Sequence, residues 1–255
     1  YFKSLPNNVG TVIVKHANPC GVSIKRDNLE SYKSALGCDP ISAFGGIVSC
    51  NFKITKNLAL ELNKLFLEVV IANNFDIGAL KILKKKKNLR LIDASNYSFN
   101  EIIRFTSSNE EILIQSNDMK KFVNKDFKVV SKKKPNKQQM KNLIFAFNIC
   151  RYVKSNAIVL AANETTAGIG SGQPSRLDSC QIAINKMNKF IKSNDELVAA
   201  SDAFFPFIDG IEKLVQSGVT AVIQPSGSIR DKEIINFANQ TNTILVFSKT
   251  RHFRH

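Results

Sequence analysis

The sequence contains little glycine or proline and no long hydrophobic run. Its 255 residues include 12 Gly and 7 Pro, too few for a collagen-like chain or a low-complexity linker protein. No apolar run approaches the roughly 20 residues that a helix needs to cross a bilayer. The N-terminus also lacks the apolar segment of a signal peptide. We therefore expect no membrane-spanning segment.

Cysteine is also scarce. The five cysteines are widely spaced and no Cys-x-x-Cys occurs, so we expect reduced thiols in a cytoplasmic protein, without a disulfide framework or a zinc ribbon. Apolar residues, at 44%, are plentiful, which excludes a wholly disordered chain. The length fits one large domain or two of ordinary size. Because residue 1 is Tyr, we expect the chain to begin inside a longer protein.

Positive charge is in excess. The chain has 36 Lys and Arg against 21 Asp and Glu, a formal net charge of +15, which is compatible with a nucleic-acid-binding module. The lysine runs at 84–87 and 132–134 lie in a sequence rich in Asn, Ile and Lys throughout, so solvated surface lysines explain them better. No nucleic-acid motif occurs. We therefore predict no nucleic-acid partner and keep the binding module as a second hypothesis that rests on charge alone.

Short β-branched runs alternate with amphipathic stretches along most of the chain. Strands are predicted at 12–14, 47–48, 69–72 and 89–92, and helices from 27, at 58–66 and at 79–84. Asp27 is expected to cap the first of these helices, with Glu30 completing a capping box. Alternating strands and helices predict an α/β layer with a largely parallel sheet.

The same alternation returns after residue 134. Helices are predicted at 140–150, 177–191, 211–217 and 231–239, and strands at 157–161, 197–200, 219–223 and 243–247. Between the two regions, residues 94–134 are polar and weakly periodic, which favours an irregular connection. We therefore predict two α/β units, residues 1–93 and 135–255, joined by residues 94–134.

His16 is the leading candidate for a catalytic group. It lies at a predicted strand end, beside Lys15 and before residues 18–21, which we expect to break regular structure. Ligands of open α/β sheets bind at such strand ends. The lysine cation favours the neutral imidazole that can act as a general base, and it could stabilise an oxyanion. A buried structural Lys–His pair explains the spacing equally well.

A zinc site of the deaminase type is rejected. Such sites use His-x-Glu followed by Pro-Cys-x-x-Cys. Here His16 is followed by Ala17 and Asn18, and Ser23 stands three residues after Cys20. The ligand set is incomplete, so we predict no metal ligand, and Cys20 can be a small buried residue.

Residues 168–173 form a glycine-rich segment. Gln173 stands where a dinucleotide fingerprint needs its last Gly, and no Gly-Lys-Ser/Thr follows, so neither motif is complete. A turn before a helix could still offer backbone N–H groups to an anion, with Arg176 as a further phosphate contact. A tight structural turn is the alternative interpretation.

Aromatic and basic residues cluster near the C-terminus. Three Phe within residues 204–207 could form core or a stacking wall for a planar heterocycle. Asp209 could cap a helix or bind a polar ligand edge. The tail 251–255 could be free, or it could fold back so that Arg251 binds an anion.

Six motifs occur in one order: VKHANPCG (14–21), SAFGG (42–46), KSNA (154–157), GIGSGQ (168–173), SDAFFPF (201–207) and RHFRH (251–255). Together they resemble the C-terminal portion of the bacterial AICAR transformylase/IMP cyclohydrolase family. The resemblance covers nearly the whole chain outside 94–134. It implies transfer of the formyl group of 10-formyltetrahydrofolate to the 5-amino group of AICAR, giving FAICAR.

The resemblance also assigns roles to individual residues. His16 would be the general base, Lys15 would stabilise the transition state, and Asn156 would orient the carboxamide and the reactive amine. The nucleotide would contact Gly45, Glu68, Arg176, Phe204 and Arg251. The folate would contact Leu177, Asp209, Ser228 and Ile229.

The resemblance further implies two cytidine-deaminase-like three-layer α/β/α units without zinc, and a homodimer whose active sites lie between subunits. It suggests a monovalent cation such as potassium as a further ligand. Four departures stand out: the absent cyclohydrolase domain, the absent Arg-Tyr-Gly-x-Asn-Pro-His-Gln segment, Pro174 and Asn73. An inactive or weakly active truncated chain is therefore the alternative to an active formyltransferase.

Overall fold

The computed structural model describes residues 9–97, 103–120, 122, 124–191 and 196–254. Its first half contains strands β1 (Val9–Lys15), β2 (Asn18–Lys25), β3 (Gly46–Cys50), β4 (Leu67–Ala72) and β5 (Arg90–Asp93), with helices α1 (Asn28–Cys38), α2 (Lys56–Asn63) and α3 (Ile77–Leu83). The segment predicted to be irregular contains β6 (Ile103–Ser108), β7 (Glu111–Ser116), a 3-10 turn (Asn124–Asp126) and β8 (Phe127–Val129).

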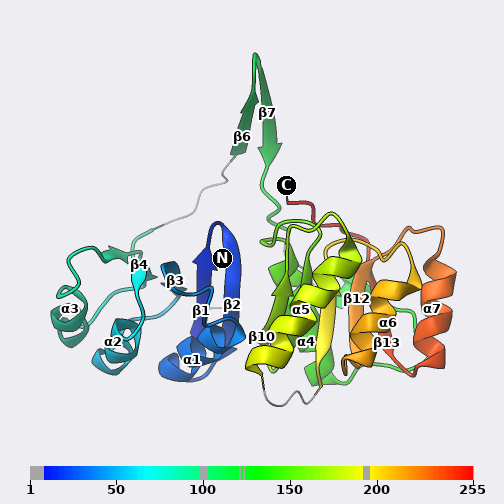
Figure 1. Cartoon of the computed structure of the whole chain (residues 1–255), viewed down its shortest axis with the longest axis horizontal. Coiled ribbons are helices and arrows are strands. Elements are labelled where there is room, and N and C mark those ends of the chain that lie inside the picture. Colours follow the sequence, from blue (N-terminus) through cyan, green and yellow to red (C-terminus); the bar gives the residue numbers. More distant parts are fainter. Residues whose placement is uncertain (1–8, 98–102, 121, 123, 192–195, 255) are drawn as a thin grey trace.

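The second half contains strands β9 (Ile158–Ala162), β10 (Thr165–Gly170), β11 (Val198–Ser201), β12 (Ala221–Pro225) and β13 (Ile244–Ser248). Its helices are α4 (Lys137–Cys150), α5 (Arg176–Phe190), α6 (Ile208–Gln216) and α7 (Asp231–Gln240). Strands of both halves join in one 11-stranded sheet, in the order β5-β4-β3-β1-β2-β10-β9-β11-β12-β13-β8 (Figure 1). The hairpin β6–β7 forms a separate ribbon that projects from it.

The sheet is mixed, so the prediction of a largely parallel sheet is wrong. Strands β3, β4 and β5 pair in parallel, as do β11, β12 and β13, but β1, β2, β9, β10 and β11 form an antiparallel centre and β8 pairs antiparallel with β13 at one end. The physical reason is two-residue turns at His16–Ala17 and Asn163–Glu164, where all four residues have positive φ. Such turns connect antiparallel strands directly, whereas a parallel pair needs a long crossover.

Of two glycine-containing segments, one was interpreted wrongly and the other only in part, since residues 171–173 do lie in a turn before α5, where Gly172 has a φ of 68°. Residues 18–21 do not break regular structure but begin β2, and Gly168 and Gly170 lie within strand β10. A Cβ atom on Gly170 would lie 1.9 Å from the carbonyl oxygen of Ser179, and one on Gly168 would lie 2.1 Å from that of Ala183. These glycines therefore allow the backbone of α5 to approach the sheet closely.

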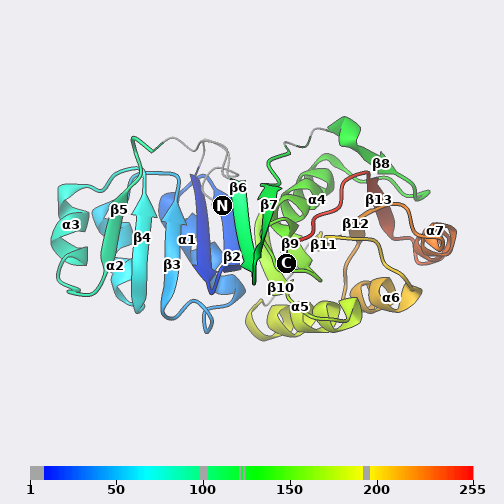
Figure 2. The ribbon, with the colours of Figure 1, turned by 90° about the horizontal axis from the view of Figure 1, so that it is seen from above.

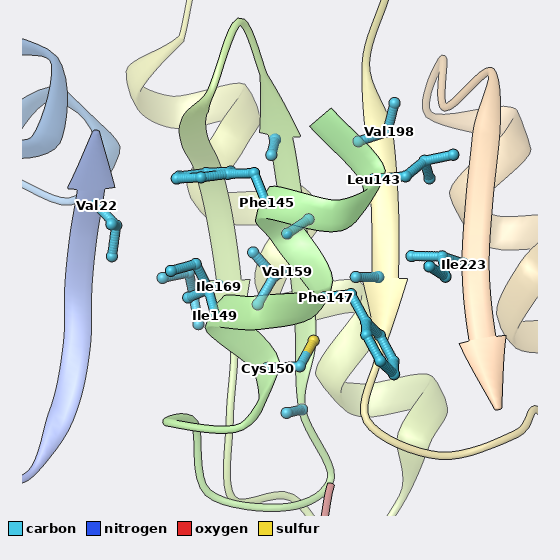
Figure 3. Close-up of a cluster of buried hydrophobic side chains, with 14 of the residues drawn as sticks. Val22, Leu143, Phe145, Phe147, Ile149, Cys150, Val159, Ile169, Val198 and Ile223 are labelled. Atoms are coloured by element: carbon cyan, nitrogen blue, oxygen red, sulfur yellow. The ribbon is translucent and has the colours of Figure 1, made fainter. Parts of the chain in front are cut away.

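Helices lie on the two faces of the second half of the sheet. Seen from above, α4 lies on one side of β9–β12 and α5 and α6 lie on the other (Figure 2). Phe145, Phe147 and Ile149 of α4 belong to a buried cluster with sheet residues such as Val159 and Ile223 (Figure 3). A second cluster lies under α5, α6 and α7, and a third under α1, α2 and α3.

Local signals explain most helix starts. Asp27 accepts a hydrogen bond from the backbone N–H of Glu30, as predicted for the cap of α1. Asn136 and Gln139 form a reciprocal capping box at the start of α4, and Ser175 caps α5. The last of these caps places Arg176 in the first turn of its helix. None of the helices in the described ranges has both the length and the hydropathy that a bilayer crossing requires.

Candidate active site

Two cavities collect most of the predicted site residues. The larger, about 480 Å³, is lined by residues that include Asn156, Arg176, Leu177, Phe204, Asp209 and Arg251. The smaller, about 350 Å³, is lined by residues that include Lys15, His16, Cys20, Ser42, Ser171 and Lys186. The strand-end turn and the C-terminal motifs therefore contribute to different cavities of one chain.

His16 lies on the tight turn between β1 and β2. The φ angles of His16 and Ala17 are 48° and 60°, and Lys15 pairs with Asn18 at the base of the turn. This is the geometry of a type I′ hairpin, which normally uses Asn and Gly because a Cβ disfavours positive φ. The turn exposes the imidazole of His16, so the interpretation as a buried Lys–His pair is wrong.

Lys15 reaches toward the loop that carries Gly45. Its Nζ donates a hydrogen bond of 2.6 Å to the carbonyl oxygen of Phe44. Gly45 has a φ of 69°, and a Cβ there would lie 4.0 Å from Lys15 Nζ and 3.7 Å from the ring of Phe66. Lys15 and Gly45, which the sequence analysis assigns separate roles, therefore lie close together. Glu68, in contrast, is exposed on β4 and lines neither cavity.

Arg176 is held by a buried carboxylate that sequence reasoning missed. One guanidinium nitrogen, Nη1, donates to Asp202 and, at 2.9 Å, to Ser201 Oγ. Asp202 is completely buried, and its other oxygen accepts from Ser155 Oγ at 2.6 Å. This charge-assisted contact fixes the plane of the guanidinium at the cavity wall. The available signal was a carboxylate directly after a predicted strand, inside the aromatic motif.

The side-chain amide of Asn156 is fully oriented. Its Nδ2 donates to the carbonyl oxygens of Gln173 (2.9 Å) and Pro174 (3.0 Å), and its Oδ1 accepts from Arg176 Nη2 at 2.5 Å. Both amide hydrogens are engaged, whereas a carbonyl oxygen has a second lone pair. Asn156 can therefore offer a ligand only an acceptor. Pro174 takes part through its backbone, so the departure at this position leaves the contact intact.

The C-terminal tail folds back against the domain. The backbone N–H of His252 donates to Asp202 O at 2.9 Å, and Arg254 Nη1 donates to Tyr152 O at 2.6 Å. Arg251 is thereby placed with its guanidinium 4.8 Å from the centre of the Phe204 ring. The prediction that the tail folds back is confirmed, and the interpretation as a free tail is wrong.

The three phenylalanines of the aromatic motif have different environments. Phe205 is 1% exposed and belongs to the core. Phe204 lies under Arg251 in the larger cavity, and Phe207 is exposed beside Arg230, whose guanidinium is 4.7 Å from its ring centre. Phe204 and Phe207 therefore both line the larger cavity with a guanidinium over the ring, and Phe204 is the one whose cation, Arg251, lines the cavity as well.

Ser228 and Ile229 lie in the loop after β12 and do not line the larger cavity. The loop approaches Arg251, because a Cβ on Gly227 would lie 3.2 Å from Arg251 Nη2. Ile229 is fully exposed. Asn18 links the two groups of site residues, since its Oδ1 accepts from the backbone N–H of Lys154, at 3.0 Å.

The smaller cavity contains two cations and no thiolate. Burial, and to a smaller extent Asp39, raise the pKa of Cys20 to about 11 against the opposing effects of Lys186 and Lys15. Burial also acts to raise the pKa of Asp39, but hydrogen bonds from Lys186 and Ser42 hold it below the usual 3.8. The Lys186–Asp39 ion pair spans 2.7 Å. Cys20 therefore stays protonated near neutral pH.

Within the described ranges, no group of three or more His, Cys, Asp or Glu side chains could hold a metal ion. This observation concerns those four residue types and leaves the predicted monovalent cation untested.

The mixed sheet, with helices on its faces, defines an α/β protein. More particularly, the chain belongs to the AICARFT/IMPCHase bienzyme family, whose model matches residues 2–186. The resemblance based on the six motifs is confirmed.

Three relatives carry the name "Bifunctional purine biosynthesis protein PurH". The protein of Caldicellulosiruptor saccharolyticus is 43% identical over 245 residues, which is 96% of this chain and 47% of the relative. That of Rhodospirillum rubrum is 44% identical over 254 residues (95% and 48%). That of Aquifex aeolicus is 43% identical over 250 residues (98% and 49%). The chain spans about half the length of these relatives.

Proposed function

We propose that this chain is the formyltransferase portion of a purine-biosynthesis enzyme. It would move the formyl group of 10-formyltetrahydrofolate to the 5-amino group of AICAR, giving FAICAR. Family membership and the relatives' printed names support the reaction class. The structural observation that carries the proposal is the convergence of Asn156, Arg176, Phe204 and Arg251 on one cavity of about 480 Å³. IMP cyclohydrolase activity would belong to the part of the relatives that this chain does not span.

The larger cavity suits an anionic, planar nucleotide. Arg251 supplies a cation for the phosphate, and Phe204 offers a ring face for the imidazole base. Asn156 can only accept a hydrogen bond, so it would select a ligand N–H, such as that of the reactive amine. Leu177 and Asp209 line the same cavity and would contact the folate, with Ser228 and Ile229 on the neighbouring loop. We also assign nucleotide contacts to Gly45 and Glu68.

The chemistry needs a base and an oxyanion stabiliser. The AICAR amine attacks the formyl carbon, forming a C–N bond and a tetrahedral oxyanion, and His16 takes the amine proton. Lys15 stabilises the oxyanion. Cleavage of the bond between the formyl carbon and N10 then releases tetrahydrofolate, and the proton returns to N10. Within one chain, His16 lines the smaller cavity and not the larger one. Active sites shared between the subunits of a homodimer would bring His16 together with the residues of the larger cavity.

We further propose the homodimer, two cytidine-deaminase-like units without zinc at residues 1–93 and 135–255, and a monovalent cation such as potassium as an activating ligand. Light scattering of the purified chain measures the dimer. Dependence of the rate on potassium measures the cation effect.

The central test is formylation of AICAR by 10-formyltetrahydrofolate. We expect His16→Asn to lower the rate at least about 100-fold, the lower end of general-base contributions. Asn tolerates the positive φ of this turn, so circular dichroism and the melting temperature should match the wild type. Retained activity in a folded His16→Asn variant would exclude His16 as the base.

The chain should be assayed beside a version extended at the N-terminus. Activity only in the extended version supports the interpretation as a weakly active truncated chain, and activity in neither contradicts the proposed function. Net charge alone supports the nucleic-acid module. Binding to duplex DNA, measured over a range of salt concentrations, tests this hypothesis. Absence of saturable binding would exclude the nucleic-acid module.

A further inference from the structure

A polar cluster that joins a buried histidine to a partly exposed carboxylate lies outside both cavities, and the proposed chemistry does not use it. His252 is 1% exposed, and its Nδ1 is hydrogen-bonded to Asp118, which follows strand β7. The imidazole packs against Phe147, with ring centres 4.5 Å apart, and edge-on against Phe122 at 5.5 Å. Arg151 contacts the same segment, because its Nη1 donates to Lys120 O at 2.7 Å.

The contacts of this cluster bracket Arg251. Asp118 holds His252, the residue after Arg251, and Lys120 Nζ donates to Thr250 Oγ1, the residue before it, at 2.8 Å. From the opposite side, Asp202 O accepts the His252 N–H at 2.9 Å. The backbone is thus fixed on both sides of Arg251, while the Arg251 side chain remains exposed at the larger cavity.

Stability alone does not account for a histidine at this place. The Nε2 atom of His252 is buried and has no hydrogen-bond partner, which costs free energy. An aliphatic side chain would pack against the two phenylalanines without that cost. A directional contact to Asp118 instead sets the position of the tail relative to the sheet.

We propose that Asp118 and His252 are positioning residues that direct Arg251 into the larger cavity. The proposal rests on the proposed function for the identity of the ligand, AICAR. It gives the segment after the β6–β7 hairpin a role: residues 118–120 clamp the tail at the nucleotide site.

The first test compares two replacements of His252 in the full chain. His252→Leu keeps apolar packing but removes the hydrogen bond, whereas Asn in His252→Asn can present its Nδ2 to Asp118. We expect His252→Leu to raise the Kd and KM for AICAR about tenfold and to leave kcat and the folate KM within about twofold. His252→Asn should recover most of the affinity. Equal loss in both variants, or none in His252→Leu, overturns the proposal.

The second test is a double-mutant cycle with Arg251→Ala. If His252 acts through Arg251, adding His252→Leu to Arg251→Ala should weaken AICAR binding no further. Additive effects would show that His252 acts independently and would overturn the proposal.

Amide hydrogen exchange separates this proposal from the proposed function. In His252→Leu, we expect faster exchange at residues 250–254 and unchanged exchange in β9 and β11. If the wild-type chain binds no AICAR, the proposed function fails. Hydrogen exchange at residues 250–254 still tests whether His252 holds the tail. Unchanged protection of these amides in His252→Leu refutes the proposal, and lost protection supports it.

Discussion

At the residue scale, the cysteine side chains are buried and their thiols are expected to be unreactive. All five are buried. Burial raises the pKa of Cys20 to about 11 and those of Cys38, Cys50 and Cys180 to about 12, and it also raises the pKa of Cys150 well above 9.0. Only the thiolate reacts readily with electrophiles. Cys20 lines the smaller cavity, yet it should be as inert as the other four.

We expect no fast thiol labelling of the folded protein. At pH 7.5 the thiolate fraction of Cys20 is below about 0.1%, so Ellman's reagent should react with none of the five cysteines over minutes. All five should react after unfolding in guanidinium, which serves as the internal control. Rapid stoichiometric labelling of native Cys20 would contradict this assignment.

Residue types and spacing singled out Lys15, His16, Phe204 and Arg251, whereas Asn156 was named through the resemblance to the family, and the roles of all five stay predictions. Spacing could not show that they divide between two cavities. It also could not show the partner of Arg176, since the contact with Asp202 depends on how the tail and two strand ends converge.

At the scale of elements, the close contact between α5 and β10 depends on two glycines of β10, which have no side chain. Gly170 and Gly168 face the carbonyl oxygens of Ser179 and Ala183. A methyl group at either position would overlap backbone atoms, which cannot move without displacing the helix. The first turn of α5 carries Arg176, so this packing also sets the depth of the guanidinium in the larger cavity.

Gly170→Ala should therefore destabilise the protein by about 3 kcal/mol or more, the upper range for overpacking. Gly37→Ala is the matched control: Gly37 lies inside α1, and a Cβ there would meet no atom within 4 Å. The control should raise the unfolding free energy by about 0.5–1 kcal/mol. Urea denaturation measures both, and equal stability of the two variants would disprove the close-packing argument.

Elements with strong periodicity, such as α4 and β4, were predictable to within a few residues. Strand β10 was not, because its glycines resemble turn residues. The β6–β7 hairpin was not anticipated, although Ile103 and Phe105 alternate with polar residues and Asn109 marks a turn. Its apolar side chains are exposed. Alternation of apolar and polar residues is normally taken to indicate a strand with one face on a core, and this hairpin has no such face.

At the scale of the whole molecule, the two halves of the sheet meet at a narrow seam. Strands β2 and β10 pair at one position, Ser23–Thr165, whose hydroxyl oxygens are 2.8 Å apart. The backbone N–H of Val22 donates to Thr166 Oγ1 at 2.9 Å. On the helical side, Lys186 of α5 reaches Asp39, the C-cap of α1. These polar contacts supplement a buried apolar cluster that also spans the two halves, with Val22 and Ile169 among its members.

Asp39→Asn tests the charge at the seam. The pKa of Asp39 is depressed in the folded state, so its stabilising effect is present above the ordinary value of 3.8. The effect disappears as the pH falls through the folded pKa, which lies below 3.8. We expect Asp39→Asn to lower the unfolding free energy by about 1–2 kcal/mol at pH 7.

The difference between wild type and Asp39→Asn should shrink in acid, as measured by urea titrations from pH 7 downward. Glu61→Gln, which removes an exposed pair with Lys64, is the control and should leave the midpoint unchanged. A difference independent of pH would show that Asp39 contributes through shape alone.

The turn at His16–Ala17 has a consequence for evolution of the chain. Two residues with side chains occupy positions where Asn-Gly would hold the same hairpin at lower conformational energy, by roughly 1–2 kcal/mol for each residue in the left-handed region. The chain thus forgoes stability that a simple substitution would supply. Selection for thermostability alone would drive the turn toward Asn-Gly, and the imidazole would be lost. Under the proposed role of His16 as general base, the strain of these two residues would be the cost of keeping an imidazole on this turn.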